Sequence, residues 1–392
     1  MQGSSVEALG RAGMEALERG DAAAARRSFE QIVASGQAPA PAWILLAQAC
    51  RLGGDAEAER DAIDQALAVD PRNLRAMIMK GDWFSRRDDI RAATSFYQFA
   101  LKLVPAGASL PPGLAADLRR AEAAVADFSR RYEGHLTDRL AQAGFSGDSV
   151  APRVQESIDI LLGNKQLYFQ QPTSYFFPGL PQIQFYERSQ FPWVAALEQA
   201  VPAMQAELAA LIEQREAAFK PYVEVPIDRA FNQSHAMLNN PDWSALYLWK
   251  NGTLVEENAS RCPRTMEALA AAPIPHIRTR SPMVLFSRLK PGTHIPPHNG
   301  MLNTRLICHI PLIVPPACRL RVGNETRNVE EGKALIFDDS IEHEAWNDSD
   351  QTRIVLLFEV WRPEISEDER RALTALFEAI NDFGGTGEAP AI

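Results

Sequence analysis

Four of the seven histidines in this chain lie between residues 294 and 343. They are His294, His298, His309 and His343. Neutral imidazole is a common ligand of iron, zinc and copper, and two histidines brought together by an antiparallel sandwich form the core of many non-haem iron sites. The clustering therefore predicts a metal site, and by itself it leaves the choice among iron, zinc and copper open.

An arginine follows the last of these histidines. Arg353 opens the strongly apolar run RIVLLFEVW. An arginine can hold a carboxylate through two parallel hydrogen bonds, and a buried guanidinium requires an anion. The alternative role is a surface charge or an ion pair with Asp348 or Asp350. The residues alone leave both roles open.

The elements that must position these residues are short strands. From Met283 onward, apolar runs are separated by the turn signals PGT, VGNE, EEGK and NDSD. The runs are MVLFSRL, TRLICHIPLIV, CRLRV, KALIFD and RIVLLFEVW. Their regular spacing predicts an antiparallel sandwich or barrel, with His294 in a proline-containing loop. Apolar periodicity predicts helices over 194–218 and 367–380.

The amino-terminal part of the chain repeats with a period of 34 residues. Several types of residue recur in register: Asp21, Asp55 and Asp89; Phe29, Ile63 and Tyr97; Gly13, Ala47 and Gly81. The period resembles that of the tetratricopeptide repeat, in which helix pairs stack into an array. The Pro- and Gly-rich stretch 104–114 ends the pattern, and a helix over 115–143 is expected to cover the last apolar face.

Composition limits the classes of function. The formal net charge of −10 and the pI near 5.3 argue against a protein that binds nucleic acid through its phosphates. No apolar run approaches the roughly 20 residues that a membrane span requires. The amino terminus does not resemble a secretory signal, so a cytoplasmic location is expected. Four cysteines without a CxxC pair predict reduced thiols.

Several long segments are similar to one known family, the aspartyl/asparaginyl β-hydroxylases. The main segments are PGTHIPPHNGMLNTRLICHIPLIVP, GNETRNVEEGKALIFDDSIEHEAWN and RIVLLFEVWRPE, with FFPGLPQIQFYERSQFPW and ALYLWKNG upstream. This resemblance covers about residues 164–364 and implies a double-stranded β-helix (jelly-roll, cupin-like) oxygenase domain over 164–392. Together with the repeat, it predicts an α+β protein with a tetratricopeptide-like domain and capping helix over 1–143 and a linker over 144–163.

The resemblance also implies cofactors and roles. The family uses Fe(II), 2-oxoglutarate and O2. By position, His298 and His343 become the catalytic iron ligands, Ser287 and Arg353 bind the distal carboxylate of 2-oxoglutarate, and His309 lies near its metal-chelating end. Paired aspartates, Asp338 and Asp339, precede His343; they are expected to orient an imidazole or, more commonly, to cap backbone amides.

Two positions modify this expectation. Most oxygenases of the wider superfamily have an Asp or Glu two residues after the first histidine ligand, whereas this chain has Gly300, as the resembled family does. The family also has an arginine toward the cosubstrate where this chain has Ile307. Residues 305, 307 and 309 would share one face of a strand, so Arg305 is expected to substitute in binding the cosubstrate.

The expected function is therefore hydroxylation of an unactivated C–H bond, the β-carbon of Asp or Asn in a peptide or protein. A repeat array favours a polypeptide substrate or partner, with neither nucleic acid nor membrane involved. The alternatives are a hydroxylase of a small amino acid or a lipid acyl chain, with halogenation as a minor possibility, and a non-catalytic repeat scaffold with a degenerate oxygenase domain. A zinc or manganese cupin-type enzyme is less favoured.

Overall fold

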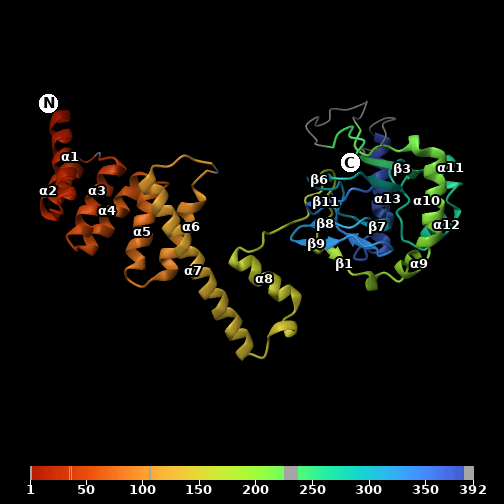
Figure 1. Cartoon of the computed structure of the whole chain (residues 1–392), viewed down its shortest axis with the longest axis horizontal. Coiled ribbons are helices and arrows are strands. Elements are labelled where there is room, and N and C mark those ends of the chain that lie inside the picture. Colours follow the sequence, from red (N-terminus) through yellow and green to blue (C-terminus); the bar gives the residue numbers. More distant parts are fainter. Residues whose placement is uncertain (1, 35, 37, 106, 225–236, 384–392) are drawn as a thin grey trace. The chain divides into compact units, whose positions relative to one another are not determined.

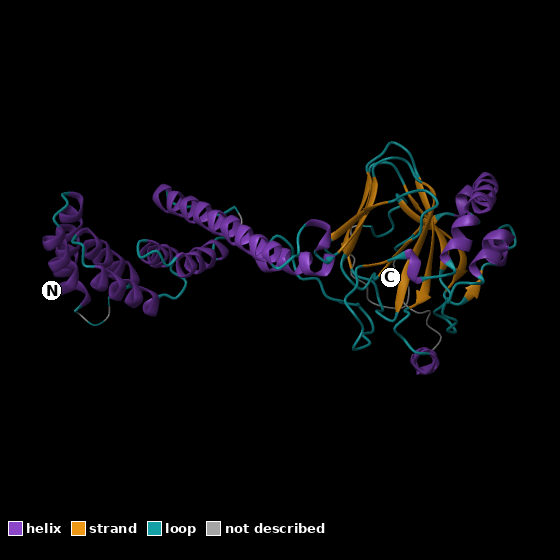
Figure 2. Ribbon diagram, turned by 90° about the horizontal axis from the view of Figure 1, so that it is seen from below, coloured by secondary structure: helices purple, strands orange, loops and turns teal. Residues whose placement is uncertain are grey.

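The computed structural model describes residues 2–34, 36, 38–105, 107–224 and 237–383. The chain divides into two compact units, Met1–Leu162 and Gly163–Ile392. Helices build the first unit, whereas the second combines antiparallel sheets with helices (Figures 1 and 2). The predicted α+β class, a helical repeat array followed by a jelly-roll domain, is confirmed.

The first unit consists of helices that pack in consecutive pairs, α1 with α2, α3 with α4 and α5 with α6, followed by α7 against α6. The helices are α1 (Gln2–Glu18), α2 (Ala22–Val33), α3 (Ala40–Leu52), α4 (Ala56–Val69), α5 (Leu74–Ser85), α6 (Ile90–Lys102), α7 (Pro112–Gln142) and α8 (Pro152–Leu162).

The 34-residue period has a local physical cause. Asp21, Asp55 and Asp89 are the N-caps of α2, α4 and α6. Each carboxylate accepts a hydrogen bond from the backbone N–H three residues later, which satisfies a donor that the helix itself cannot pair. The same capping residue therefore begins the second helix of every pair.

Close packing explains the recurring small residues. A Cβ on Gly13 would overlap the ring of Phe29, and a Cβ on Gly81 would overlap the ring of Tyr97. Both rings are buried. Each aromatic ring thus occupies the space that a larger side chain on the preceding helix would need, and the hairpin closes only around a glycine or similarly small residue.

The end of the first unit differs in part from the expectation. Helix α7 covers the array with Leu118 and Ala121, the buried residues of that helix. The segment 144–163, expected as a linker, contains a 3-10 turn (Gly147–Ser149) and the helix α8.

The second unit contains two antiparallel sheets. The larger sheet has the order β1-β10-β7-β12-β5-β3-β2, with β4 paired to β3, and the smaller sheet has the order β6-β11-β8-β9. The strands are β1 (Phe185–Tyr186), β2 (Lys220–Pro221), β3 (Trp243–Lys250), β4 (Thr253–Leu254), β5 (Val284–Leu289), β6 (Thr293–His298), β7 (Arg305–Ile313), β8 (Cys318–Val322), β9 (Glu325–Asn328), β10 (Leu335–Phe337), β11 (His343–Asn347) and β12 (Arg353–Trp361).

The larger sheet is buried on both faces, which explains its continuous apolar runs. Along β12, Leu356 and Phe358 face a core built with α9 (Val194–Gln199), α10 (Val201–Arg215) and α12 (Pro263–Leu269). Val355 and Leu357 face the other way, into a core shared with the smaller sheet. A short helix α11 (Glu256–Ala259) lies beside β3, and α13 (Glu367–Phe383) closes the unit through Leu373 and Phe377.

Two predicted elements have different boundaries in the structure. The single helix expected over 194–218 is divided at Ala200, where Pro202 lies in the first turn of α10. The loop expected around His294 is strand β6, although it contains Pro296 and Pro297. Because β6 is at the edge of the smaller sheet and, among the described strands, pairs with β11 alone, missing backbone donors are tolerated there.

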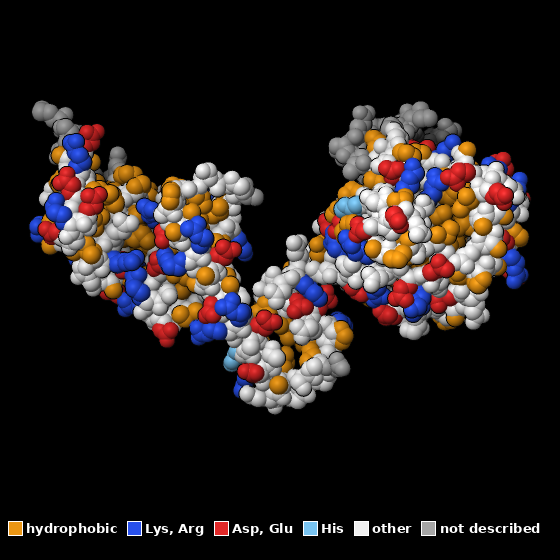
Figure 3. Space-filling model, in the orientation of Figure 1, with side chains coloured by type: hydrophobic (Ala, Val, Ile, Leu, Met, Phe, Trp, Pro, Cys, Tyr) orange, Lys and Arg blue, Asp and Glu red, His pale blue; other side chains and the backbone are white. Residues whose placement is uncertain are grey.

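The surface charges and the state of the cysteines agree with what the composition predicts. Figure 3 shows acidic and basic side chains interspersed over the displayed face of both units. The four cysteines are free and buried. Within residues 2–383, excluding the gaps given above, no helix combines the length and apolar character needed to cross a bilayer.

Candidate active site

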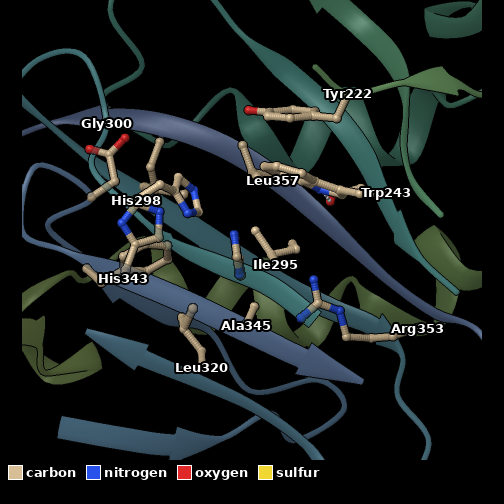
Figure 4. Close-up of a pocket in the computed structure, with 15 residues that line it drawn as sticks. Tyr222, Trp243, Ile295, His298, Gly300, Leu320, His343, Ala345, Arg353 and Leu357 are labelled. Carbon is tan, nitrogen blue, oxygen red and sulfur yellow. Dashed lines mark hydrogen bonds between the residues drawn. The ribbon is translucent and has the colours of Figure 1, made fainter. Parts of the chain in front are cut away.

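A cavity lies between the two sheets of the second unit. Its empty volume is about 540 Å³, with the open solvent at its mouth included. Residues from both sheets line it: Tyr222, Trp243, Ser287, Ile295, His298, Gly300, Ile307, His309, Leu320, Phe337, Asp339, His343, Ala345, Arg353 and Leu357. Two histidines occupy one end and Arg353 extends into the other (Figure 4).

His298 and His343 are brought together by strand register. His298 ends β6, His343 begins β11, and the two residues are direct partners in this antiparallel pair. Their ring centroids are 4.1 Å apart. A pair separated by 45 positions in sequence thus becomes a pair of adjacent imidazoles, as two ligands of one metal ion must be.

Backbone contacts fix the tautomer of both rings. The Nδ1 atom of His298 is 2.8 Å from the carbonyl oxygen of Pro296, and Nδ1 of His343 is 3.1 Å from that of Ile341. A carbonyl oxygen can only accept, so each Nδ1 donates and each Nε2 carries the lone pair. Metal-binding histidines are oriented by this type of contact.

Burial favours the neutral form of two imidazoles in this cavity, those of His343 and His309. Desolvation lowers the pKa of His343 to about 4. Desolvation also lowers the pKa of His309, and the nearby Arg353 lowers it further. A neutral imidazole is the form that binds a metal ion, so His343 is ready for coordination near neutral pH.

Gly300 has no space for a side chain. A Cβ at this position would overlap the carboxylate of Asp339, which also lines the cavity. The backbone N–H of Gly300 donates to the carbonyl oxygen of Asp339 at 2.7 Å. Among the described residues, no cluster of three or more His, Cys, Asp or Glu side chains has the geometry to hold a metal ion. The described protein groups at this end are therefore two imidazoles with a carboxylate beside Gly300.

Arg353 is buried, and no described residue provides an anion for it. The residue is 1% exposed. Its Nε and Nη1 atoms have no hydrogen-bond partner among the described residues. The ion pair considered from the sequence does not form, since Asp348 pairs with Arg319 instead. Burial lowers the pKa of Arg353 to about 10. A cation in this position fits an anionic ligand inside the cavity.

The remaining predicted residues take different places. Ser287 lines the cavity, and its hydroxyl accepts a hydrogen bond from the indole of Trp243 at 3.2 Å. His309 lines the cavity as well, with Nδ1 unpartnered among the described residues. Arg305 does not line it. The Arg305 guanidinium lies 3.3 Å from Asp339 and 2.9 Å from Glu359, so two carboxylates already compensate its charge.

The neighbouring polar residues have structural partners. His294 lies outside the cavity, where its Nε2 is 2.8 Å from Glu344 and its ring stacks on Trp346. Asp338 accepts from the backbone N–H of Ser340, as a capping aspartate does, and also pairs with Arg362. The Nδ1 atoms of His298 and His343 contact the backbone carbonyls of Pro296 and Ile341.

Sequence reasoning did not identify two aromatic residues of the cavity. Tyr222 and Trp243 stack with ring centroids 4.3 Å apart and form one wall (Figure 4). The Trp243 ring is 5.9 Å from that of His298. The sequence signal was the run WSALYLWK, in which Trp243 is followed by polar Ser244. Nothing in this run indicates that Trp243 faces the histidines.

Comparisons with known proteins agree with this description. Residues 198–363 match the family described as Aspartyl/Asparaginyl beta-hydroxylase, so the resemblance seen in the sequence is confirmed. The human aspartyl/asparaginyl beta-hydroxylase is 40% identical over 136 residues, which cover 34% of this chain and 18% of that protein. The ornithine lipid ester-linked acyl 2-hydroxylase of Rhizobium tropici is 35% identical over 188 residues, 47% of this chain and 62% of that protein.

The repeat unit has a structural neighbour of its own. The Sgt2 TPR domain from Aspergillus fumigatus aligns with a TM-score of 0.28 and 19% identity, covering 32% of this chain and 82% of that one. This chain spans 18% of the length of the human hydroxylase that it matches.

Proposed function

We propose that this chain, whose residues 198–363 match the aspartyl/asparaginyl beta-hydroxylase family, is an Fe(II)- and 2-oxoglutarate-dependent oxygenase that hydroxylates an unactivated C–H bond. One observation carries the proposal: a buried arginine, for which no described residue provides an anion, shares a cavity with two adjacent histidines whose lone pairs are on Nε2. A dianionic ligand that binds a metal at one end and an arginine at the other fits both features.

The residues have different roles at the two ends of the cavity. His298 and His343 would hold Fe(II) through Nε2. Arg353, with Ser287 beside it, would bind the distal carboxylate of 2-oxoglutarate through parallel hydrogen bonds. When bound, iron and 2-oxoglutarate supply the oxidising chemistry, in which O2 and 2-oxoglutarate are consumed, succinate and CO2 are released, and one oxygen atom enters the substrate.

The protein itself contributes position and exclusion of water. Ile295, Leu320, Ala345 and Leu357 form apolar walls between the two ends of the cavity. These walls strengthen the contact of Arg353 with a carboxylate, because an ion pair in a water-poor environment is less screened. They also fix the direction in which a ligand can extend from the arginine toward the histidines.

Substitution of the histidines tests the proposal. His298→Ala and His343→Ala should each abolish succinate formation from 2-oxoglutarate, measured with Fe(II) and O2 present. His294→Ala is a matched control, because His294 lies outside the cavity on a neighbouring position of β6. Turnover of 2-oxoglutarate that survives in both ligand variants would rule the assignment out. Iron binding without any oxygen consumption would favour the non-catalytic scaffold.

For the substrate, we propose the β-carbon of an Asp or Asn residue in a polypeptide. The repeat unit supports a polypeptide because it has a polar hollow lined by residues of α3, α5, α6 and α7. Arg51 and Arg75 are exposed there and form no ion pair with described residues, whereas Arg86 and Arg120 are paired with acidic side chains. Two uncompensated cations favour an acidic segment of the partner.

A double substitution tests this role of the hollow. Arg51→Ala with Arg75→Ala should raise KM for a peptide substrate and leave kcat and peptide-independent 2-oxoglutarate turnover unchanged. The matched control is Arg27→Ala with Arg91→Ala, two exposed arginines on α2 and α6 that do not line the hollow. An unchanged KM would show that the hollow does not recruit the substrate.

Hydroxylation of a lipid acyl chain is the second candidate. The similarity to the Rhizobium tropici acyl 2-hydroxylase over 188 residues and the largely apolar cavity walls favour it. A gain of one oxygen atom on an acyl lipid, with peptides unmodified, would select this function.

A further inference from the structure

The strand pairing next to the two histidines is irregular. In the pairing of β6 with β11, the register shifts between His343 and Ala345, directly beside the pair of His298 and His343. Such a shift locally disrupts the ladder of backbone hydrogen bonds. On the other side of the histidine pair both strands end, and the chain continues as two loops, 299–304 and 338–342. The positions of the imidazoles therefore depend on what holds these two loops together.

The two loops contact each other directly. The backbone N–H of Gly300 donates to the carbonyl oxygen of Asp339 at 2.7 Å. The side-chain amide of Asn299, the residue that follows His298, donates to the carbonyl oxygen of Ser340 at 2.9 Å. The Asn299 amide thus connects the loop after one histidine with the loop before the other, where the ladder has already ended.

A third segment, residues 170–173, contacts both loops. The backbone N–H of Gln171 donates to the carbonyl oxygen of Ser340 at 2.7 Å, and that of Thr173 donates to the carbonyl oxygen of Gly300 at 2.9 Å. The segment therefore has one backbone hydrogen bond to each loop. It also precedes residues 198–363, so the match to the family does not include it.

The side chain of Gln170 connects the same two loops. Its Oε1 accepts from the amide of Asn303 at 2.9 Å, and its Nε2 donates to the carboxylate of Asp338 at 2.7 Å. Asn303 comes five residues after His298, and Asp338 comes five residues before His343. Gln170 is 6% exposed and the other two partners are 0% exposed. Neither loop can move away without leaving a buried polar atom unpaired, which is costly.

These contacts matter most for a site with few protein ligands. In the proposed function, on which this inference rests, only His298 and His343 hold the iron, so no third protein ligand fixes their spacing. Gln170 is not among the described residues that line the cavity, and it can act on the metal only through the two loops. We propose that Gln170 is a positioning residue of the metal site, with Asn299 in the same role.

Gln170→Met in the full chain tests the proposal. Methionine has a similar length and removes both hydrogen bonds between the loops. We expect Kd for Fe(II), measured by anaerobic equilibrium dialysis, to rise about 10-fold or more, as for other residues that orient metal ligands. Succinate formation should fall at limiting Fe(II) and recover at saturating Fe(II). The visible absorption of the Co(II)-loaded chain should also change, because it depends on the geometry of the ligands.

Gln205→Met is the matched control. The side chain of Gln205, on α10 of the same unit, donates to the carbonyl oxygen of Leu312 at 2.8 Å and to Glu331 at 2.9 Å. Both variants lose the hydrogen bonds of one glutamine, and only Gln170→Met should bind Fe(II) more weakly. A folded Gln170→Met variant with the wild-type Kd and Co(II) spectrum would overturn the proposal. An equal loss of Fe(II) affinity in the control would do the same.

Asn299→Ala decides the question if Gln170→Met does not fold. Asn299 is half-buried, and the Ser340 carbonyl keeps the N–H of Gln171 as a donor, so the fold loses less. Kd for Fe(II) should rise about fivefold, which corresponds to one neutral hydrogen bond. An unchanged Kd would contradict the positioning role.

The wild-type chain separates this inference from the proposed function. If it binds Fe(II) and forms succinate while the folded variants bind Fe(II) equally well, the oxygenase assignment stands and the positioning role is wrong. If the wild-type chain binds no Fe(II), the oxygenase assignment fails and the positioning role fails with it.

Discussion

Two buried arginines at opposite ends of strand β12 have opposite surroundings. Arg362, which follows the strand, is 0% exposed and donates to Asp338 at 2.6 Å, to the Tyr186 hydroxyl at 2.6 Å and to the Pro181 carbonyl at 2.9 Å. Arg353, which begins the strand, has two nitrogen atoms without a partner among the described residues. The two arginines are equally buried and differ in their hydrogen-bond partners. Arg362 stabilises the fold, whereas Arg353 is available for a ligand.

The largest expected effect is loss of stability at Arg362. Arg362→Met leaves the carboxylate of Asp338 buried and unpaired, and breaking such a pair costs about 3–5 kcal/mol of the free energy of unfolding. Urea denaturation of the full chain measures it. Arg278→Met, which removes an exposed pair with Asp382, should change stability much less, because solvent screens such a pair. Equal losses of stability in the two variants would contradict the structural role assigned to Arg362.

The next effect concerns ligand binding at Arg353. Arg353→Met should raise KM for 2-oxoglutarate by about 100-fold, because one partner of a desolvated charge pair is lost. Affinity for Fe(II) should change little, since the histidines lie at the other end of the cavity. Arg353→Lys should retain part of the affinity but not the two parallel hydrogen bonds. A KM that Arg353→Met leaves unchanged would contradict the assignment.

Arg353→Met should also change the free energy of unfolding, in the opposite direction to Arg362→Met. Without cosubstrate, Arg353→Met should be more stable than the wild type by about 1–3 kcal/mol, since an uncompensated buried charge is removed. The folded-state pKa of Arg353 is lowered to about 10 from its ordinary value of 12.5, so the cost of the buried charge is fully present below pH 10. Above that pH the advantage of the variant should shrink. Saturating 2-oxoglutarate should also reduce it, by stabilising only the wild type.

The smallest effect is expected at Ser287. Ser287→Ala removes one neutral hydrogen-bonding group near Arg353, which corresponds to about 1 kcal/mol or about a fivefold increase in KM for 2-oxoglutarate. The indole of Trp243 also loses its acceptor. Ser287→Thr keeps the hydroxyl and serves as the comparison. If both variants bind 2-oxoglutarate as the wild type does, Ser287 is not a ligand of the cosubstrate.

Features with local causes could be predicted from the sequence. The repeat period follows from capping aspartates and from glycines that face aromatic rings, both of which act within one helix pair. Strands β5, β7, β10 and β12 of the larger sheet were recognisable as apolar runs, because burial on both faces makes them continuously apolar. The adjacency of His298 and His343, in contrast, depends on the register of β6 and β11, and the prolines of β6 concealed that strand.

Features that depend on tertiary neighbours could not be predicted. Arg305 was expected to face the cosubstrate because it shares a strand face with Ile307 and His309. Its pairing with Glu359 requires the neighbouring strand β12, and its pairing with Asp339 requires the turn before β11. Tyr222 lines the cavity next to Trp243, on which its ring stacks. No local pattern in the sequence encodes these contacts.

The close approach of Gly300 and Asp339 also limits how this site can change over generations. A side chain at residue 300 would meet the carboxylate of Asp339, so a substitution there requires that carboxylate to move. A lineage that adds a protein ligand at position 300 would therefore have to move or replace Asp339 as well. The two-histidine site proposed above would be separated from such a three-ligand site by this additional change.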